Sequence, residues 1–214
     1  MKFYLKEFTP GQYGYDLEAG DGSATLGDYV EALDAFQEAT MADCRGCDAC
    51  CYERIPLTIA DFAIARPWVA ERLQTTEDAV TLTHWLTAMA DIRLLENGAI
   101  DIILKRQADY GCHFLNRDKQ ECAIHPYRPL VCRTHCCLPK SEAAIALRSD
   151  IINAGEDELC RQLLALPEHP WQQLLTGCRR EDYPASGFSQ AAATDWRQIP
   201  LKTISDDTHW LDQP

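Results

Sequence analysis

Cysteines in one short segment of this sequence are spaced as metal ligands. The segment covers residues 44–51 and reads CRGCDACC. Gaps of two residues let successive thiolates turn toward one ion, as they do in zinc knuckles and iron–sulfur loops. Gly46 can adopt the left-handed backbone conformation that such a turn often requires. The spacing therefore predicts a metal site whose first ligands are Cys44, Cys47 and Cys50.

Cys51 departs from the simplest form of this pattern. Bacterial ferredoxins place the fourth cysteine three residues after the third and follow it with proline, whereas Cys51 directly follows Cys50. Adjacent cysteines rarely reach one ion with relaxed geometry, so we expect Cys51 to bind a second metal or to bridge two.

A second group of cysteines occupies residues 112–137. Cys112 and Cys122 flank a polar stretch, which predicts a hairpin with one cysteine on each arm. The group continues toward a short helical segment that carries further thiols. Together the two groups indicate that metal ligation holds residues 44–51 against residues 112–136.

The last part of this group begins with a proline. Pro129 suits the first turn of a short helix, and on that helix Cys132 and Cys136 would share a face because they are four residues apart. Cys137 would point elsewhere, so it is left out of the predicted ligand set.

The cellular compartment follows from the cysteine count and the start of the chain. The chain has 11 cysteines in 214 residues, and it begins with charged residues where a secretory signal needs an apolar run. No stretch approaches the ~20 apolar residues of a membrane helix. We therefore expect a cytoplasmic protein, in which clustered thiols act as metal ligands rather than as disulfides.

Charge excludes several classes of partner. The formal net charge is -13, with 46% hydrophobic and 25% charged residues, the composition of an ordinary globular protein. Such a charge repels phosphate backbones and anionic membrane surfaces. We therefore expect neither nucleic acid nor a membrane as a partner. The partners that the cysteines indicate are metal ions.

Helices and hairpins must position the cysteines. Apolar residues at helical spacing predict helices over about 24–42, from Thr58 onward, over about 76–91 and over 141–166. In the last of these, Gly155 is expected to separate two helices. Asn97-Gly98 between apolar runs predicts a β-hairpin.

These elements predict a mainly α fold of the α+β class, a compact helical domain with a small β-hairpin, built around a cysteine metal cluster. The expected organisation is an irregular leader over 1–22, a cysteine-cluster domain over 23–166 with its motif core at 44–137, and a C-terminal extension over 167–214.

Four motifs in this order resemble a known family, the YkgJ-type zinc- or iron-chelating cysteine-cluster (CxxCxxCC) proteins. The motifs are CxxCxxCC at 44–51, Cys-x-Phe-Leu at 112–115, Cys-x-Ile-(Tyr or His) at 122–125 and Arg-Pro-x-x-Cys-Arg at 128–133. His125 stands where the family commonly has tyrosine. The motifs are also similar to the cysteine-rich part of flagellin lysine N-methylases, which are longer proteins. The resemblance implies metal binding.

The predicted ligand set carries more negative charge than one divalent ion can balance, and uncompensated buried charge is costly. We therefore expect several metals or a cluster, with Arg128 and Arg133 as cofactor-binding residues that donate to sulfur. The predicted metal ligands are eight thiolates: Cys44, Cys47, Cys50, Cys51, Cys112, Cys122, Cys132 and Cys136.

Several functions remain open at this point. The favoured expectation is a metal-binding protein in which an iron–sulfur cluster, or alternatively zinc, has a structural or electron-carrying role. An enzyme that resembles the lysine methyltransferase flagellin N-methylase is one alternative, although no S-adenosylmethionine loop or acid–base set is evident and no catalytic residue is predicted. A metal chaperone is the other alternative.

Overall fold

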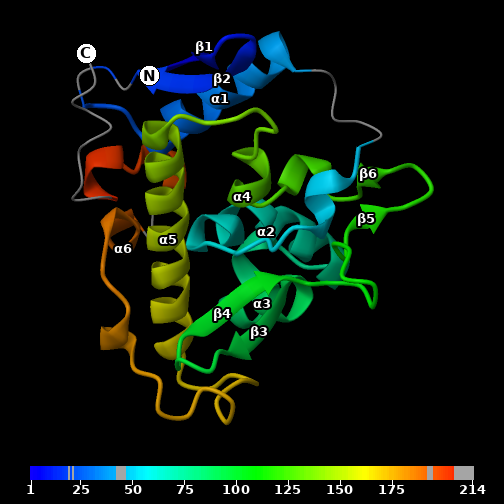
Figure 1. Ribbon diagram of the computed structural model, residues 1–214. Coiled ribbons are helices and arrows are strands. Elements are labelled where there is room, and N and C mark those ends of the chain that lie inside the picture. The colour runs from blue at the N-terminus through cyan, green and yellow to red at the C-terminus, as the bar shows by residue number, and fades with distance from the viewer. Residues whose placement is uncertain (19, 21, 42–46, 192–194, 205–214) are drawn as a thin grey trace. The chain divides into compact units, whose positions relative to one another are not determined.

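The computed structural model describes residues 1–18, 20, 22–41, 47–191 and 195–204 (Figure 1). The chain divides into two units. Unit 1 comprises Met1–Cys44, Arg133–Ala154 and Ala185–Pro214, and unit 2 comprises Arg45–Cys132 and Gly155–Pro184. Helices predominate in the described residues, and the strands form small antiparallel pairs. The predicted mainly α fold with small hairpins, of the α+β class, is confirmed.

Unit 1 begins with a β-hairpin, so the irregular leader predicted for residues 1–22 is wrong. Strands β1 (Lys2–Thr9) and β2 (Gln12–Glu18) pair antiparallel. Between them Gly11, with a φ of +80°, follows Pro10. Proline followed by a glycine at positive φ is typical of a tight type II turn, and this pair was the local signal that the sequence offered for the hairpin.

Helix α1 (Leu26–Thr40) confirms the helix predicted over about 24–42. A capping box starts it, because Asp28 accepts hydrogen bonds from the backbone and the side chain of Thr25 at 2.8 and 2.9 Å. The helix packs on the hairpin through aromatic side chains, and the ring centroids of Phe3 and Tyr29 lie 5.5 Å apart. Burial of these rings fixes β1 and β2 against α1.

Helix α5 (Glu142–Leu164) is continuous, as Figure 1 shows, so the predicted break at Gly155 is wrong. Glycine in a helix interior costs about 1 kcal/mol relative to alanine. Here Gly155 is buried, and Ile151 and Leu159, one turn away on either side, are also buried. Burial of this apolar face outweighs the local preference of glycine. The residues of α5 up to Ala154 belong to unit 1 and the rest to unit 2.

Unit 2 contains a helix pair and a hairpin. Helices α2 (Ile59–Leu73) and α3 (Leu82–Met89) pack together, and the hairpin consists of β3 (Ala90–Leu94) and β4 (Ile100–Leu104) (Figure 1). The hairpin expected around Asn97-Gly98 is confirmed. The helix expected from Thr58 is confirmed as well, whereas that expected over 76–91 begins only at Leu82, after a 3-10 turn.

The free edge of β4 pairs with the segment that follows the first cysteine motif. The amide of Leu57 donates to the carbonyl of Ile102, and the amide of Leu104 donates to the carbonyl of Ile55, each at 2.9 Å. These bonds hold residues 55–57 alongside β4. They therefore fix the exit of the CRGCDACC segment to a buried strand.

The remaining elements of the described residues are short. They are η1 (Ala49–Tyr52), η2 (Glu77–Ala79), β5 (Leu115–Asn116), β6 (Glu121–Cys122), η3 (His125–Tyr127), α4 (Leu130–Arg133), η4 (Arg180–Asp182), α6 (Gly187–Ala191), η5 (Trp196–Gln198) and η6 (Leu201–Thr203). Residues 167–184 belong to unit 2, and the described residues after Pro184 belong to unit 1. The domain boundaries expected near residues 22 and 166 stay a prediction.

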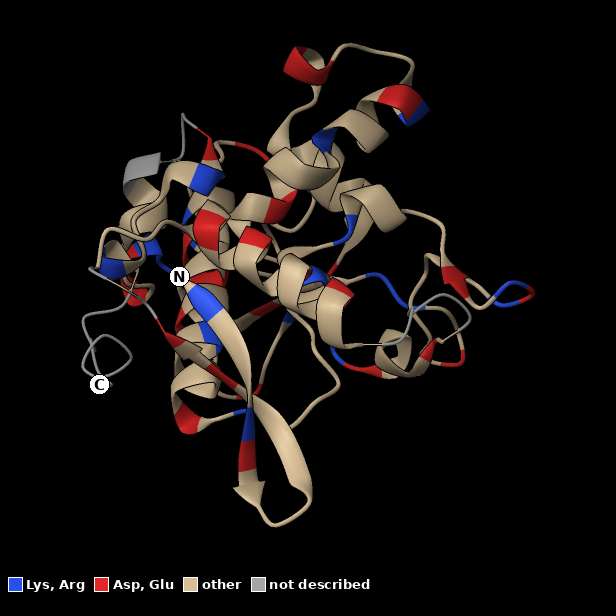
Figure 2. Cartoon of the chain, turned by 90° about the horizontal axis from the view of Figure 1, so that it is seen from above, with Lys and Arg blue, Asp and Glu red and all other residues tan. Residues whose placement is uncertain are grey.

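Acidic side chains are distributed over most elements of the protein. Figure 2 shows Asp and Glu on helices and loops throughout the chain, with Lys and Arg interspersed.

None of the helices in the described part of the chain has the length and apolar character needed to span a membrane.

Two carboxylates of unit 2 share one arginine. The guanidinium of Arg54 pairs with Asp101 on β4 and lies 3.4 Å from Glu156 on α5. The Glu156 side chain is only 22% exposed. Burial raises the pKa of Glu156 to about 7 even though Arg54 acts in the opposite direction. This glutamate therefore changes its charge near neutral pH.

We expect Glu156→Gln to remove a pH dependence of folding stability. Between pH 4.5, the ordinary pKa of glutamate, and pH 7, the folded state keeps a proton that the unfolded state releases. Glu156 therefore adds about 2 to 3 kcal/mol to the free energy of unfolding at low pH. This stabilisation is fully present below pH 4.5 and is lost as the pH rises through 7. Urea unfolding at pH 5 and pH 8 should show this fall in the wild type and not in Glu156→Gln. Parallel pH profiles of the two proteins would contradict it.

Candidate metal centre

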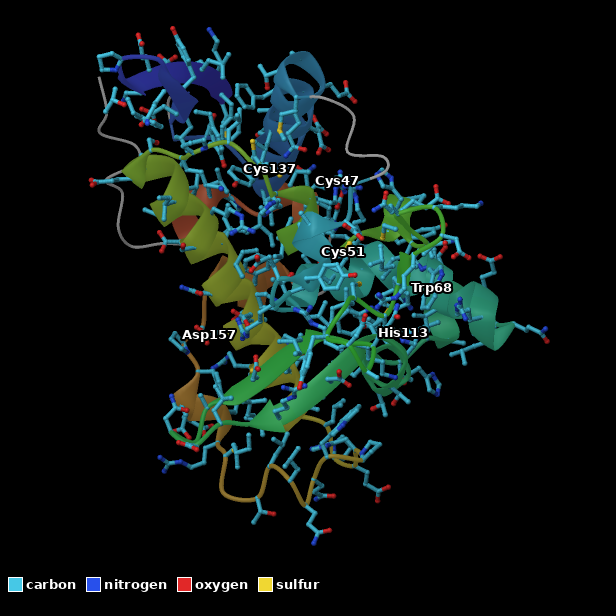
Figure 3. The ribbon with its side chains drawn as sticks, turned by 45° about the vertical axis from the view of Figure 1, so that its right-hand side comes forward. Cys47, Cys51, Trp68, His113, Cys137 and Asp157 are labelled. Atoms are coloured by element: carbon cyan, nitrogen blue, oxygen red, sulfur yellow. The ribbon has the colours of Figure 1, made fainter. Side chains whose placement is uncertain are left out.

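The first cysteine motif forms a loop and the short helix η1. Cys50 and Cys51 lie in η1 and are partly exposed, and Cys47, just before it, is exposed. Figure 3 shows Cys47 and Cys51 on this segment. The amide of Cys51 donates to the carbonyl of Asp48 at 2.8 Å, which closes the turn. Cys44, the first predicted ligand, lies outside the described residues together with the rest of 42–46.

Backbone and side-chain hydrogen bonds hold η1 next to the second cysteine group. The amide of Cys112 donates to the carbonyl of Cys51 at 2.8 Å. Arg106 donates to the same carbonyl at 3.4 Å, to the carbonyl of Tyr110 at 2.6 Å and to the carbonyl of Glu53. Arg106 thus braces the loops that carry the two cysteines, a role that its sequence context does not predict because two of its partners are carbonyls of distant residues.

A hairpin forms between Cys112 and Cys122 as predicted, but it is short and only Cys122 lies on one of its arms. Strands β5 and β6 have two residues each, and Cys122 on β6 pairs with Leu115 on β5. Cys112 precedes β5, where its carbonyl accepts a hydrogen bond from the amide of Leu115 at 3.0 Å. The hairpin therefore brings one cysteine to each end of a tight loop.

The predicted helix with Cys132 and Cys136 on one face is wrong, because α4 ends at Arg133. The side chain of Gln37 donates to the carbonyls of Arg133 and His135 at 3.4 and 3.1 Å, in place of the amides that a longer helix would supply. Pro139, which has no amide hydrogen, limits a helix only beyond this point. Cys132 and Cys136 therefore do not share a helical face.

Cys136 is placed in unit 1, whereas Cys132 ends the central segment of unit 2. The Cys136 thiol is buried and lies 3.3 Å from the thioether sulfur of Met41. The neighbour that the structure shows for the Cys136 thiol is therefore Met41, which is not a predicted ligand. That Cys136 binds metal stays a prediction.

Four of the predicted ligands influence one another electrostatically within unit 2. Burial is the main cause that raises the pKa of Cys112, Cys122 and Cys132, and neighbouring thiols raise it further. For Cys50 the main cause of a raised pKa is its hydrogen bond with Cys51, followed by burial. These thiols therefore stay protonated at neutral pH unless a cation replaces their protons.

The four thiols are not arranged as a finished coordination shell. Within the described residues, no three side chains of His, Cys, Asp or Glu are gathered closely enough to hold a metal ion. Their chemistry nevertheless fits a soft or borderline metal, because thiolates are the donors that zinc and iron–sulfur clusters use.

Arg128 lies where a cation would assist thiolates. Its guanidinium acts to lower the pKa of both Cys50 and Cys122. Its Nε atom is buried and has no hydrogen-bond partner among the described residues. A buried N–H without an acceptor is costly, and a thiolate or cluster sulfur would satisfy it. Arg128 therefore fits the predicted role.

The other predicted arginine has a different partner. Arg133 belongs to unit 1, where its guanidinium lies 3.0 Å from a carboxylate oxygen of Asp34. Its role as a donor to sulfur stays a prediction.

Among the histidines, His113 packs edge-on against Phe114, with ring centroids 5.1 Å apart. Figure 3 labels His113, which follows β4 in the chain.

Comparison with known proteins connects this geometry to one family. Residues 43–149 match the model of the CxxCxxCC family, described as "Putative zinc- or iron-chelating domain". This region contains the candidate thiols and Arg128. No curated protein and no solved structure matches the chain.

Proposed function

Since the chain belongs to the CxxCxxCC family of zinc- or iron-chelating domains, we propose that it holds an iron–sulfur cluster or zinc in a structural or electron-carrying role. What supports this proposal is that Cys50, Cys112, Cys122 and Cys132 all lie in unit 2, where the amide of Cys112 bonds to the carbonyl of Cys51 and so ties the first cysteine motif to the second group. Cys44, Cys47 and Cys51 would add ligands from the CRGCDACC segment.

The balance of charge favours a cluster with several irons over a single zinc ion. The candidate ligands just named include seven cysteines, which offer more thiolates than one divalent ion can neutralise. A cluster of several irons distributes this charge, and the spacing of Cys44, Cys47 and Cys50 is the one that bacterial ferredoxins use. Arg128 would donate its unpartnered N–H to a sulfur atom. When bound, the metal would link the segments and, if it is redox-active, carry one electron.

Anaerobic purification from iron-replete cells tests the nature of the metal. We expect brown protein with broad charge-transfer absorption and acid-labile sulfide, because thiolate-ligated iron clusters have these properties. Metal analysis should find iron with sulfide, and purification in air should lower both. Zinc, which needs no assembly, can occupy the same thiols when iron is lost.

Two other outcomes have defined meanings. Colourless protein that contains stoichiometric zinc and no sulfide under these conditions would decide for zinc and a structural role. Protein without zinc or iron after anaerobic isolation, which also fails to take up either metal, would contradict the proposed function.

A further inference from the structure

A buried carboxylate of α2 is bonded to two parts of unit 2 at once. Asp61 is 1% exposed. One of its oxygens accepts hydrogen bonds from the backbone and the side chain of Thr58 at 2.7 and 3.0 Å, which completes the capping box of α2. The other oxygen accepts a hydrogen bond of 2.5 Å from the backbone amide of Leu130.

The bond to Leu130 reaches the segment that carries one of the candidate ligands. Leu130 is the first residue of α4, and Cys132 follows two positions later in the same helix. Helix α4 has only four residues and little internal hydrogen bonding of its own. An acceptor fixed in α2 is therefore bonded to the residue at which α4 begins, two positions before Cys132.

We propose that Asp61 is a positioning residue that holds Cys132 in place for metal binding, an inference that rests on the proposed function. It does not contact the metal in this role. Its two oxygens join the N-terminus of α2 to the start of α4, so the segment is ordered before the metal arrives and less conformational freedom is lost on binding.

Asp61→Asn is the informative change because it keeps the size of the side chain. A carboxylate offers two acceptor oxygens, whereas an amide offers one oxygen and an NH2 donor. The variant can therefore satisfy either Thr58 or Leu130 but not both. Loss of a residue that orients a metal ligand typically weakens metal binding about 10- to 100-fold.

Asp28→Asn in α1 is a matched control. Asp28 occupies the same position of a capping box, with bonds of 2.8 and 2.9 Å to Thr25. It is exposed and lies in unit 1. This variant therefore reproduces the loss of a helix cap without a bond to a cysteine segment, and its affinity for metal should change by less than about twofold.

The experiment measures the affinity for Zn²⁺ of the anaerobic full-length protein, in competition with a chromophoric chelator, in the wild type and both variants. Amide hydrogen exchange at Leu130 is measured in the metal-free proteins. We expect Asp61→Asn to weaken zinc binding about 10- to 100-fold and to accelerate exchange at Leu130, and Asp28→Asn to change neither appreciably.

Each outcome has a separate meaning. Wild-type affinity in a folded Asp61→Asn variant with accelerated exchange at Leu130 would overturn this proposal and leave the proposed function intact. If that variant does not fold, exchange at Leu130 in the metal-free wild type decides, and the rate of an unstructured peptide would refute the positioning role. A wild-type protein that takes up neither zinc nor iron would remove the proposed function, and this inference with it.

Discussion

Anaerobic removal of metal will lower the melting temperature of the protein by roughly 10 °C. The candidate thiols come from η1, from the loop before β5, from β6 and from α4, all short elements with few backbone bonds of their own. A metal that binds only the folded state would join them and stabilise that state by several kcal/mol if it is nearly saturating. Its removal leaves neutral thiols with raised pKa values in place of metal–sulfur bonds.

The measurement is thermal unfolding followed by circular dichroism, before and after treatment with a chelator under argon. Metal analysis of the same samples verifies the removal, and restoration of the metal should return the melting temperature to its starting value. An unchanged curve in protein shown to be free of metal would refute the coupling between metal and fold.

Substitution of motif cysteines will release metal, whereas substitution of the cysteines outside the motifs will not. Cys47→Ala and Cys132→Ala each remove a thiolate, and we expect about 100-fold or greater loss of affinity because structural metal sites share a large binding energy among few ligands. Cys160→Ala and Cys178→Ala should retain metal. Cys160 is buried in α5, where burial raises its pKa, so it acts as a small apolar side chain.

Cys160→Ala and Cys178→Ala, outside the motifs, also serve as controls for folding. Cys160→Ala should cost about 1 kcal/mol of stability through lost packing and yet keep its metal, which separates destabilisation from loss of a ligand. Metal content and urea unfolding are measured on the same preparations. Equal loss of metal from the motif variants and from the Cys160 and Cys178 variants would show that the division into ligands and other cysteines is wrong.

Features that depend on neighbouring residues could be predicted from the sequence. The capping boxes of α1 and α2 are set by residues three apart, and the hairpin between β3 and β4 by Asn97-Gly98. The CRGCDACC segment likewise shows its chemistry in its spacing. In all these cases the interacting groups are close in the sequence, so the pattern of residues contains the information.

Tertiary packing decided the features whose partners are distant in the sequence. Burial of its helical face carries α5 through Gly155, and the side chain of Gln37 takes a carbonyl just beyond α4 that a longer helix would have used. The bond from Leu130 to Asp61 joins residues 69 positions apart. The sequence by itself determined which cysteines are candidate ligands. Only the tertiary structure decided which of the segments that carry them are bonded to one another, because spacing along the chain encodes local periodicity and not the contacts made when distant segments pack.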